Sequence, residues 1–193
     1  MTGETGTTVA WRHVAARDGF EVVFLSETAA GARRLEGYVS ATEDSRAWAV
    51  RYDIAVDADG RTRSAKVRTR TAQGRRTVTV EADGDGRWIV DGAPAPRLGG
   101  CLDIDLEASA ATNSFPVARL GLAVGAAADA PAAYVRVLDP AVERLEQRYE
   151  RIADAGDRRR FRYAAPAFAF EAVLVYDKRG FVVDYPGIAV QAP

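Results

Sequence analysis

Strict alternation of large apolar and small or polar side chains is the feature that most constrains this chain. In the segment Trp48–Val56 the even positions are Trp, Val, Tyr, Ile and Val, while the odd positions between them are Ala, Arg, Asp and Ala. Successive side chains of an extended strand point to opposite faces, so this pattern predicts a β-strand with one buried face.

Turn signals separate further segments of the same kind. The residues at 57–60, Asp-Ala-Asp-Gly, predict a tight turn into a strand at Arg61–Arg70, and Gln-Gly at 73–74 predicts the next turn into Arg75–Glu81. Near the C-terminus, apolar alternation over 168–176, a turn at 177–180 and the segment 181–185 predict a hairpin. The sequence therefore indicates an antiparallel meander.

Only residues 140–152 show helical spacing, because Val142, Leu145, Tyr149 and Ile152 recur every three or four positions. The competing interpretation is a hairpin in which 144–152 turns at Asp-Ala-Gly-Asp, 154–157, into 158–163. The surrounding β pattern and the turn residues favour the hairpin. We expect an all-β fold with few or no helices.

Residues 1–8 are small and polar, and they contain too little apolar surface to offset the entropy of ordering them. We therefore expect a disordered tail at 1–8. With no linker or internal repeat in the remainder, residues 9–191 are expected to form a single domain, which is an ordinary size for one core.

Charge and composition exclude several function classes. The 26 basic and 27 acidic side chains leave a formal charge of -1, so the chain has no global field to attract nucleic acid or an anionic membrane. No stretch approaches the roughly 20 apolar residues of a transmembrane segment, and the N-terminus lacks a secretory pattern. Together with the single cysteine, Cys101, these features predict a cytoplasmic protein.

The sequence carries no standard metal, cofactor or nucleophile motif. His13 is the only histidine, so a multi-histidine zinc site is excluded, and we expect neither a metal nor a cofactor. The turn at 57–60 resembles the start of a calcium loop, but its twelfth position is Arg68 instead of Glu. A nucleophile pair of Cys101 and His13 is conceivable, although a lone cysteine in an apolar strand is usually a core residue.

Arginines cluster at two places, around 68–76 and around 158–162. The first cluster contains Arg68, Arg70, Arg75 and Arg76, and either cluster could pair with phosphate. A solvated strand face is the commoner explanation of such clusters, and we expect no binding of nucleic acid.

The stretch Gly99 to Leu120 differs from the rest. Alternation from Leu102 to Leu106 places Asp103 and Asp105 together on the face opposite the leucines. If that face is buried, both carboxylates need partners, since an unpaired buried charge is costly. The later residues Thr112, Asn113 and Arg119 are candidate partners. Alternation alone leaves a buried and an exposed acidic face equally open.

Several motifs occur in a fixed order: Gly-Cys-Leu-Asp-Ile-Asp-Leu at 100–106, Thr-Asn-Ser-Phe-Pro at 112–116, Arg-Leu at 119–120, Gln-Arg-Tyr at 147–149 and Asp-Tyr-Pro-Gly at 184–187. On these motifs the chain, from about Trp11 to Ile188, resembles the putative glycolipid-binding family of bacteria. The resemblance implies one long antiparallel sheet curled into a β-roll or open barrel, similar in shape to bacterial lipoprotein carriers.

Three hypotheses for function follow. The first is a non-catalytic carrier that binds a glycolipid or another amphiphile on the concave face of the sheet. Its aromatic lining would come from Trp48, Tyr52, Trp88, Phe168 and Phe170, and its polar cluster from Asp103, Asp105, Asn113, Arg119, Arg148 and Tyr185. In the alternative, a small-molecule enzyme uses Asp103 or Asp105 as general acid or base with an arginine as anion anchor. The third is a protein–protein module; the oligomeric state stays open.

Overall fold

The computed structural model describes residues 6–15, 17–139 and 141–193. Within these ranges fourteen strands form one sheet in the order β10-β13-β14-β15-β16-β17-β1-β2-β3-β4-β5-β6-β7-β8. Their bounds are β1 Thr7–His13, β2 Asp18–Glu27, β3 Arg33–Glu43, β4 Arg46–Val56, β5 Thr62–Thr71, β6 Gly74–Ala82, β7 Trp88–Val90, β8 Ala93–Pro94, β10 Ala127–Asp129, β13 Arg148–Ala155, β14 Arg158–Ala165, β15 Phe170–Tyr176, β16 Val182–Tyr185 and β17 Ala189–Gln191.

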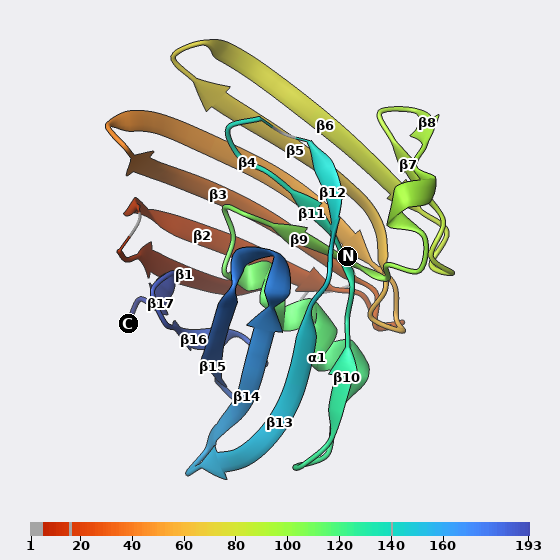
Figure 1. The fold of residues 1–193 in the computed structure, drawn as a ribbon, viewed down its shortest axis with the longest axis vertical. Coiled ribbons are helices and arrows are strands. Elements are labelled where there is room, and N and C mark those ends of the chain that lie inside the picture. Colours follow the sequence, from red (N-terminus) through yellow and green to blue (C-terminus); the bar gives the residue numbers. More distant parts are fainter. Residues whose placement is uncertain (1–5, 16, 140) are drawn as a thin grey trace.

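Neighbouring strands of this sheet are antiparallel, and the edge strands β10 and β8 do not pair with each other. The sheet is therefore open and curls around its contents (Figure 1). This confirms the expected all-β open roll. The meander of β4, β5 and β6 is confirmed as well, with turns at 57–61 and 72–73.

A second, three-stranded sheet consists of β9 (Asp103–Leu106), β11 (Ala132–Val135) and β12 (Val142–Leu145), with β9 and β11 parallel. The sequence analysis did not anticipate this sheet. In the chain, β9 is followed by a 3₁₀ turn, η2 (Ala111–Asn113), and by the α-helix α1 (Ser114–Leu120), and both precede β10 and β11.

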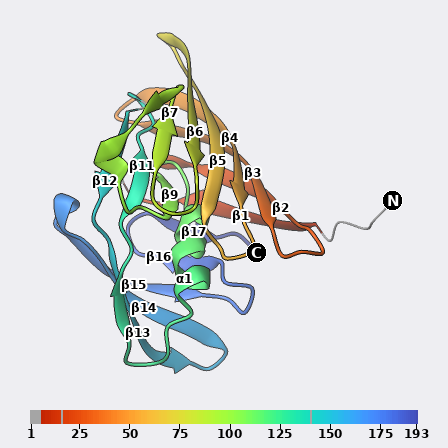
Figure 2. The same ribbon diagram turned by 90° about the vertical axis from the view of Figure 1, so that its right-hand side faces the viewer.

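The segment from β9 to α1 lies between the two halves of the large sheet, β2–β6 on one side and β13–β15 on the other (Figures 1 and 2). Hydrogen bonds fasten it to both halves. The Thr62 hydroxyl of β5 accepts a bond from the Ile104 amide at 3.0 Å, and the Tyr149 hydroxyl of β13 donates to Asn113 Oδ1 at 3.0 Å. The stretch with the family motif is thus internal to the curled sheet, and it is buried on both faces.

The hairpin interpretation is confirmed for 148–163, because β13 and β14 pair as antiparallel strands, but its first strand begins at Arg148 instead of Arg144. The helical spacing in this region arises from a change of sheet: Val142 and Leu145 belong to β12, whereas Tyr149 belongs to β13. Each strand buries its own apolar residues, so the combined spacing mimics a helix.

Two expected boundaries shift. Phe168 lies in a 3₁₀ turn, η3 (Pro166–Phe168), and the strand begins only at Phe170, because proline fixes a turn conformation and lacks an amide hydrogen. Of the tail expected at 1–8, residues 1–5 lie outside the described residues. Thr7 and Thr8 instead begin β1, where they pair with Leu25 and Phe24 of β2.

A glycine on β3 creates the space for a fully buried polar contact between β4 and β2. Gly37 lies opposite Tyr52, and a Cβ on Gly37 would come within 1.9 Å of the Tyr52 ring. The ring therefore passes over Gly37 to reach β2, where its hydroxyl donates to the carboxylate of Glu21. Both Tyr52 and Glu21 are fully buried.

We expect Gly37→Ala to lower the free energy of unfolding by about 3 kcal/mol or more, because the methyl displaces the ring and breaks the Tyr52–Glu21 bond. Chemical denaturation followed by circular dichroism measures this loss. Gly6→Ala, where a Cβ would meet nothing within 4 Å, is the matched control and should stay within about 0.5 kcal/mol of the parent. Equal effects of the two variants would contradict this account.

Candidate functional site

A pocket of about 240 Å³ opens on the concave side of the sheet beside Asp105. Its floor comes from β9, which contributes Asp105, and from the segment that follows β9, which contributes Glu107, Ser109 and Asn113. Its walls come from residues far away in the sequence: Arg17, Tyr134, Tyr163, Phe168, Phe170 and Tyr185. Tyr134 lies on β11, directly beside Asp105 in the small sheet.

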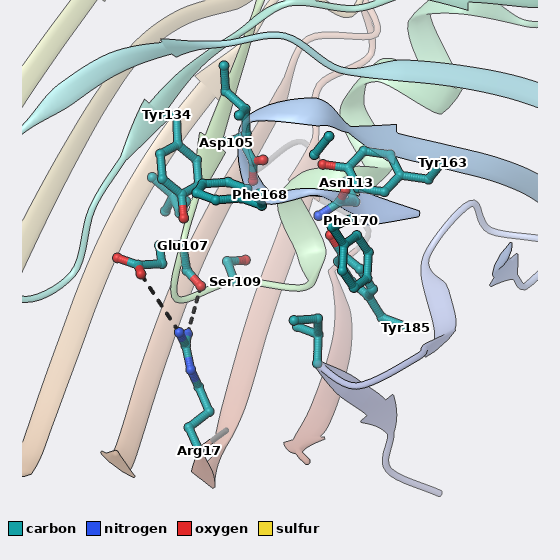
Figure 3. Close-up of a pocket in the computed structure, with 14 residues that line it drawn as sticks. Arg17, Asp105, Glu107, Ser109, Asn113, Tyr134, Tyr163, Phe168, Phe170 and Tyr185 are labelled. Carbon is teal, nitrogen blue, oxygen red and sulfur yellow. Dashed lines mark hydrogen bonds and ion pairs between the residues drawn. The ribbon is translucent and has the colours of Figure 1, made fainter. Parts of the chain in front are cut away.

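Aromatic rings form two opposite walls of the pocket (Figure 3). Tyr134 and Phe168 lie on one side, with ring centroids 5.5 Å apart. Tyr163, Phe170 and Tyr185 lie on the other, with centroid distances of 5.9 to 6.1 Å. Phe168 is 48% exposed, so it stands at the mouth, whereas the tyrosines are buried.

Asp105 lies between these walls (Figure 3). One of its oxygens accepts a hydrogen bond from the Thr112 hydroxyl at 2.9 Å, and the other accepts from the Gln147 side-chain amide at 2.6 Å. No cation pairs with it among the described residues. Burial therefore dominates and raises the pKa of Asp105 to about 6, with the two hydrogen bonds opposing the rise and the charges of Asp103 and Glu107 adding to it.

Arg17 and Glu107 form the charged end of the pocket. The Arg17 guanidinium donates to the backbone carbonyl of Glu107 at 2.7 Å and lies 3.9 Å from its carboxylate and 3.5 Å from that of Glu43 (Figure 3). It also stacks on the Trp48 ring, 5.4 Å from the centroid. Arg17 is thus fixed by two carboxylates and one ring, and its charge is compensated.

The structure brings three of the predicted polar residues together: Asp105, Asn113 and Tyr185 all line the pocket. Phe168 and Phe170 join them as walls. Asp103 is buried as well, but it points elsewhere and takes both bonds of the Arg119 fork, with Nε to Oδ1 at 3.1 Å. This pair ties α1 to β9, and neither residue lines the pocket.

The other predicted residues do not line this pocket. Trp48, Tyr52 and Trp88 are buried in the core, since the inward face of their strands is covered by the segment from β9 to α1. Trp88, for example, donates its indole hydrogen to the Cys101 carbonyl at 2.9 Å. Arg148 lies on an exposed surface and pairs with Asp129 at 2.7 Å.

Sequence reasoning missed Arg17, Glu107, Ser109, Tyr134 and Tyr163. None of them belongs to a motif, and only the order Gln-Arg-Tyr at 147–149 hinted that a second segment faces Asp105, through Gln147. That amide also contacts the Tyr163 hydroxyl at 3.0 Å, so it links the pocket floor to one wall.

The conceivable pair of Cys101 and His13 does not have the electrostatics of a nucleophile and its base. Burial raises the pKa of the Cys101 thiol to about 11, and burial together with Arg17 lowers the pKa of His13 to about 4. The thiol therefore stays protonated at neutral pH.

The described residues contain no group of three or more potential metal ligands. No helix in the described ranges is long and apolar enough to span a bilayer.

Comparison with known proteins places these features in context. The family model described as "Putative glycolipid-binding" matches residues 8–191. The crystal structure of a DUF1089 family protein from Pseudomonas aeruginosa is similar, with 30% sequence identity and a TM-score of 0.75 over 92% of this chain and 93% of that one. A beta-barrel-like DUF1849 protein from Brucella abortus shares the fold alone, with 9% identity and a TM-score of 0.52 over 96% and 93% of the two chains. None of the curated proteins matches.

The raised pKa of Asp105 predicts a defined pH dependence of stability. A carboxyl group with a higher pKa in the folded than in the unfolded chain contributes stability that is present below its unfolded value of 3.8 and is lost as the pH rises toward 6. We expect the free energy of unfolding of Asp105→Asn, taken relative to that of the parent, to rise by about 3 kcal/mol between pH 3 and pH 7. Urea denaturation of both proteins across this range measures the difference, and a constant difference would contradict burial of the charged carboxylate.

Proposed function

We propose that this chain, which belongs to the putative glycolipid-binding family, binds an amphiphile. The head group of the amphiphile, an uncharged and hydroxyl-rich group such as a sugar, lies in the pocket beside Asp105. The binding is non-covalent, and the ligand leaves unchanged. The lipid tail stays outside the pocket, along the apolar surface at its mouth.

One observation carries this proposal: a carboxylate stands between two walls of aromatic rings. A sugar ring offers C–H faces, which pack on aromatic rings, and hydroxyl groups at its edge, which donate to carboxylate and amide oxygens. Tyr134 and Tyr163 supply the flat surfaces, while Asp105 and Asn113 supply the acceptors. An apolar lining with a few convergent polar groups is the usual composition of a ligand site.

The volume limits what enters. About 240 Å³ lies below the roughly 300 Å³ at which sites for drug-sized ligands begin, so the pocket accommodates one head group and no complete lipid. Phe168, half exposed at the mouth, then offers its outer face to the first part of the tail.

Charge favours a neutral head group over a phosphorylated one. The pocket holds two carboxylates, Asp105 and Glu107, and one guanidinium, Arg17, which is already engaged by Glu43 and Glu107. An anionic group would therefore meet net negative charge at short range, where little water screens it.

Phe168→Ala tests the proposal at little risk to folding, because the side chain is 48% exposed. With n-octyl-β-D-glucopyranoside below its micelle concentration as the probe, we expect the variant to bind about tenfold more weakly than the parent in isothermal titration calorimetry, since one ring of the wall is lost. Phe24→Ala removes an equally exposed ring, also 48%, from the outer face of β2 and is the matched control. The proposal fails if the parent shows no saturable binding or if both variants bind equally.

The raised pKa of Asp105 also favours one alternative, an enzyme in which this carboxyl acts as general acid or base. The same probe separates the two functions. A binding protein returns octyl glucoside intact after prolonged incubation, whereas a hydrolase releases octanol and glucose, which chromatography detects; release that Asp105→Asn abolishes would replace binding by catalysis.

A further inference from the structure

A second and larger cavity, of about 550 Å³, lies far from Asp105, where the β3–β4 and β5–β6 hairpins turn. Its lining includes Arg46, Arg75, Arg76, Thr69, Thr71 and Leu138. We call it the rim cavity. None of its lining residues belongs to the pocket described above.

The rim cavity carries positive charge without matching negative charge. Arg46 has one carboxylate nearby, that of Asp44 at 3.7 Å, and both side chains are more than half exposed. Within the described residues no carboxylate lies within ion-pair distance of Arg75 or Arg76. The pairing of β5 with β6 sets Arg76 opposite Thr69, on the face of the sheet that also carries the buried Val67 and Val78.

A buried hydroxyl without a partner faces the same cavity. Thr69 is 4% exposed, and its Oγ1 has no hydrogen-bond partner in the structure. Its neighbour across the strand pair is Arg76. A buried polar group left unpaired is costly, and the cost is removed when a ligand accepts its hydrogen bond.

We propose that the rim cavity is a binding site for a phosphoryl group, in which the forks of Arg46 and Arg76 pair with phosphate oxygens and the Thr69 hydroxyl donates to a third. Guanidinium forks match phosphate oxygens in geometry and charge. The site is independent of the sugar pocket, whose compensated and partly acidic lining disfavours anions.

Titration with inorganic phosphate at low ionic strength tests the site. We expect saturable binding by the parent in isothermal titration calorimetry, loss of about tenfold or more in affinity for Arg76→Gln, and a smaller loss for Thr69→Val, because the charge-assisted pairs are the stronger contacts. Thr69→Val keeps shape and folding intact, since it deletes only the unpaired hydroxyl. Arg12→Gln removes an exposed arginine outside the cavity and should bind as the parent does.

Phosphate binding that Arg76→Gln and Arg12→Gln retain equally overturns the proposal, and so does an absence of saturable binding by the parent. Phe168→Ala should keep full phosphate affinity, so failure of the sugar pocket and failure of the rim cavity are distinguishable. Two further probes identify the source of the phosphoryl group. Binding of glycerol 3-phosphate indicates a soluble ester, and Arg76-dependent sedimentation with phosphatidate-containing vesicles indicates a lipid head group.

Discussion

The buried carboxylate of Glu21 is the centre of the contacts that hold the segment from β9 to α1 against strands β2 to β4 of the large sheet. Its Oε2 accepts the Ala110 amide at 2.7 Å, and its Oε1 accepts the hydroxyls of Tyr52 and Ser109. Complete burial raises the pKa of Glu21, and these hydrogen bonds act against that rise. Because Ser109 also lines the pocket, the position of the floor depends on this carboxylate. The glycine at position 37 belongs to the same arrangement, since it leaves room for the ring of Tyr52.

The sequence allowed the meander to be predicted, because strand alternation and turn residues act over a few positions. On β2 the same logic fails: Phe20 and Phe24 are about half exposed, whereas Glu21 points inward. Hydrophobicity alone would place this strand the other way round. The orientation of β2 is decided by the segment from β9 to α1, because the Ala110 amide and the Ser109 hydroxyl of that segment need a hydrogen-bond acceptor. No local sequence pattern on β2 shows this requirement.

The site was predictable only in part for a related reason. Alternation correctly placed Trp48, Tyr52 and Trp88 on the inward face of the sheet. It could not show that the segment from β9 to α1 covers that face, so that these side chains pack in the core instead of lining a pocket. It likewise grouped Asp103 with Asp105, although β9 is buried on both faces and each carboxylate has its own partners. Arg17 and Tyr134 lie about ninety and thirty residues from Asp105 along the chain, and Tyr134 reaches the pocket because β11 pairs in parallel with β9, a non-local contact that no local pattern encodes.

Charge is segregated within a chain whose totals nearly cancel. Around Asp105 the carboxylates outnumber the guanidinium groups, and Arg17 is held by its neighbours. At the rim, Arg46 has only the exposed Asp44 beside it, and Arg75 and Arg76 have no acidic partner among the described residues. Within the pocket beside Asp105, the floor and the mouth differ in how many contacts hold their residues. Gln147 donates to Asp105 and to the Tyr163 hydroxyl and so holds the floor against one wall, whereas Phe168 stands on a turn that ends at Ala169 with a φ of 48°, a conformation that alanine adopts only at a cost. The hydrogen bond from the Ala169 amide to the Pro166 carbonyl at 3.0 Å closes that turn, so a strained backbone presents the one aromatic wall residue that faces solvent. Under the proposed function, the fixed floor would therefore select the head group, and the mouth, with fewer contacts, would accept tails of different structure.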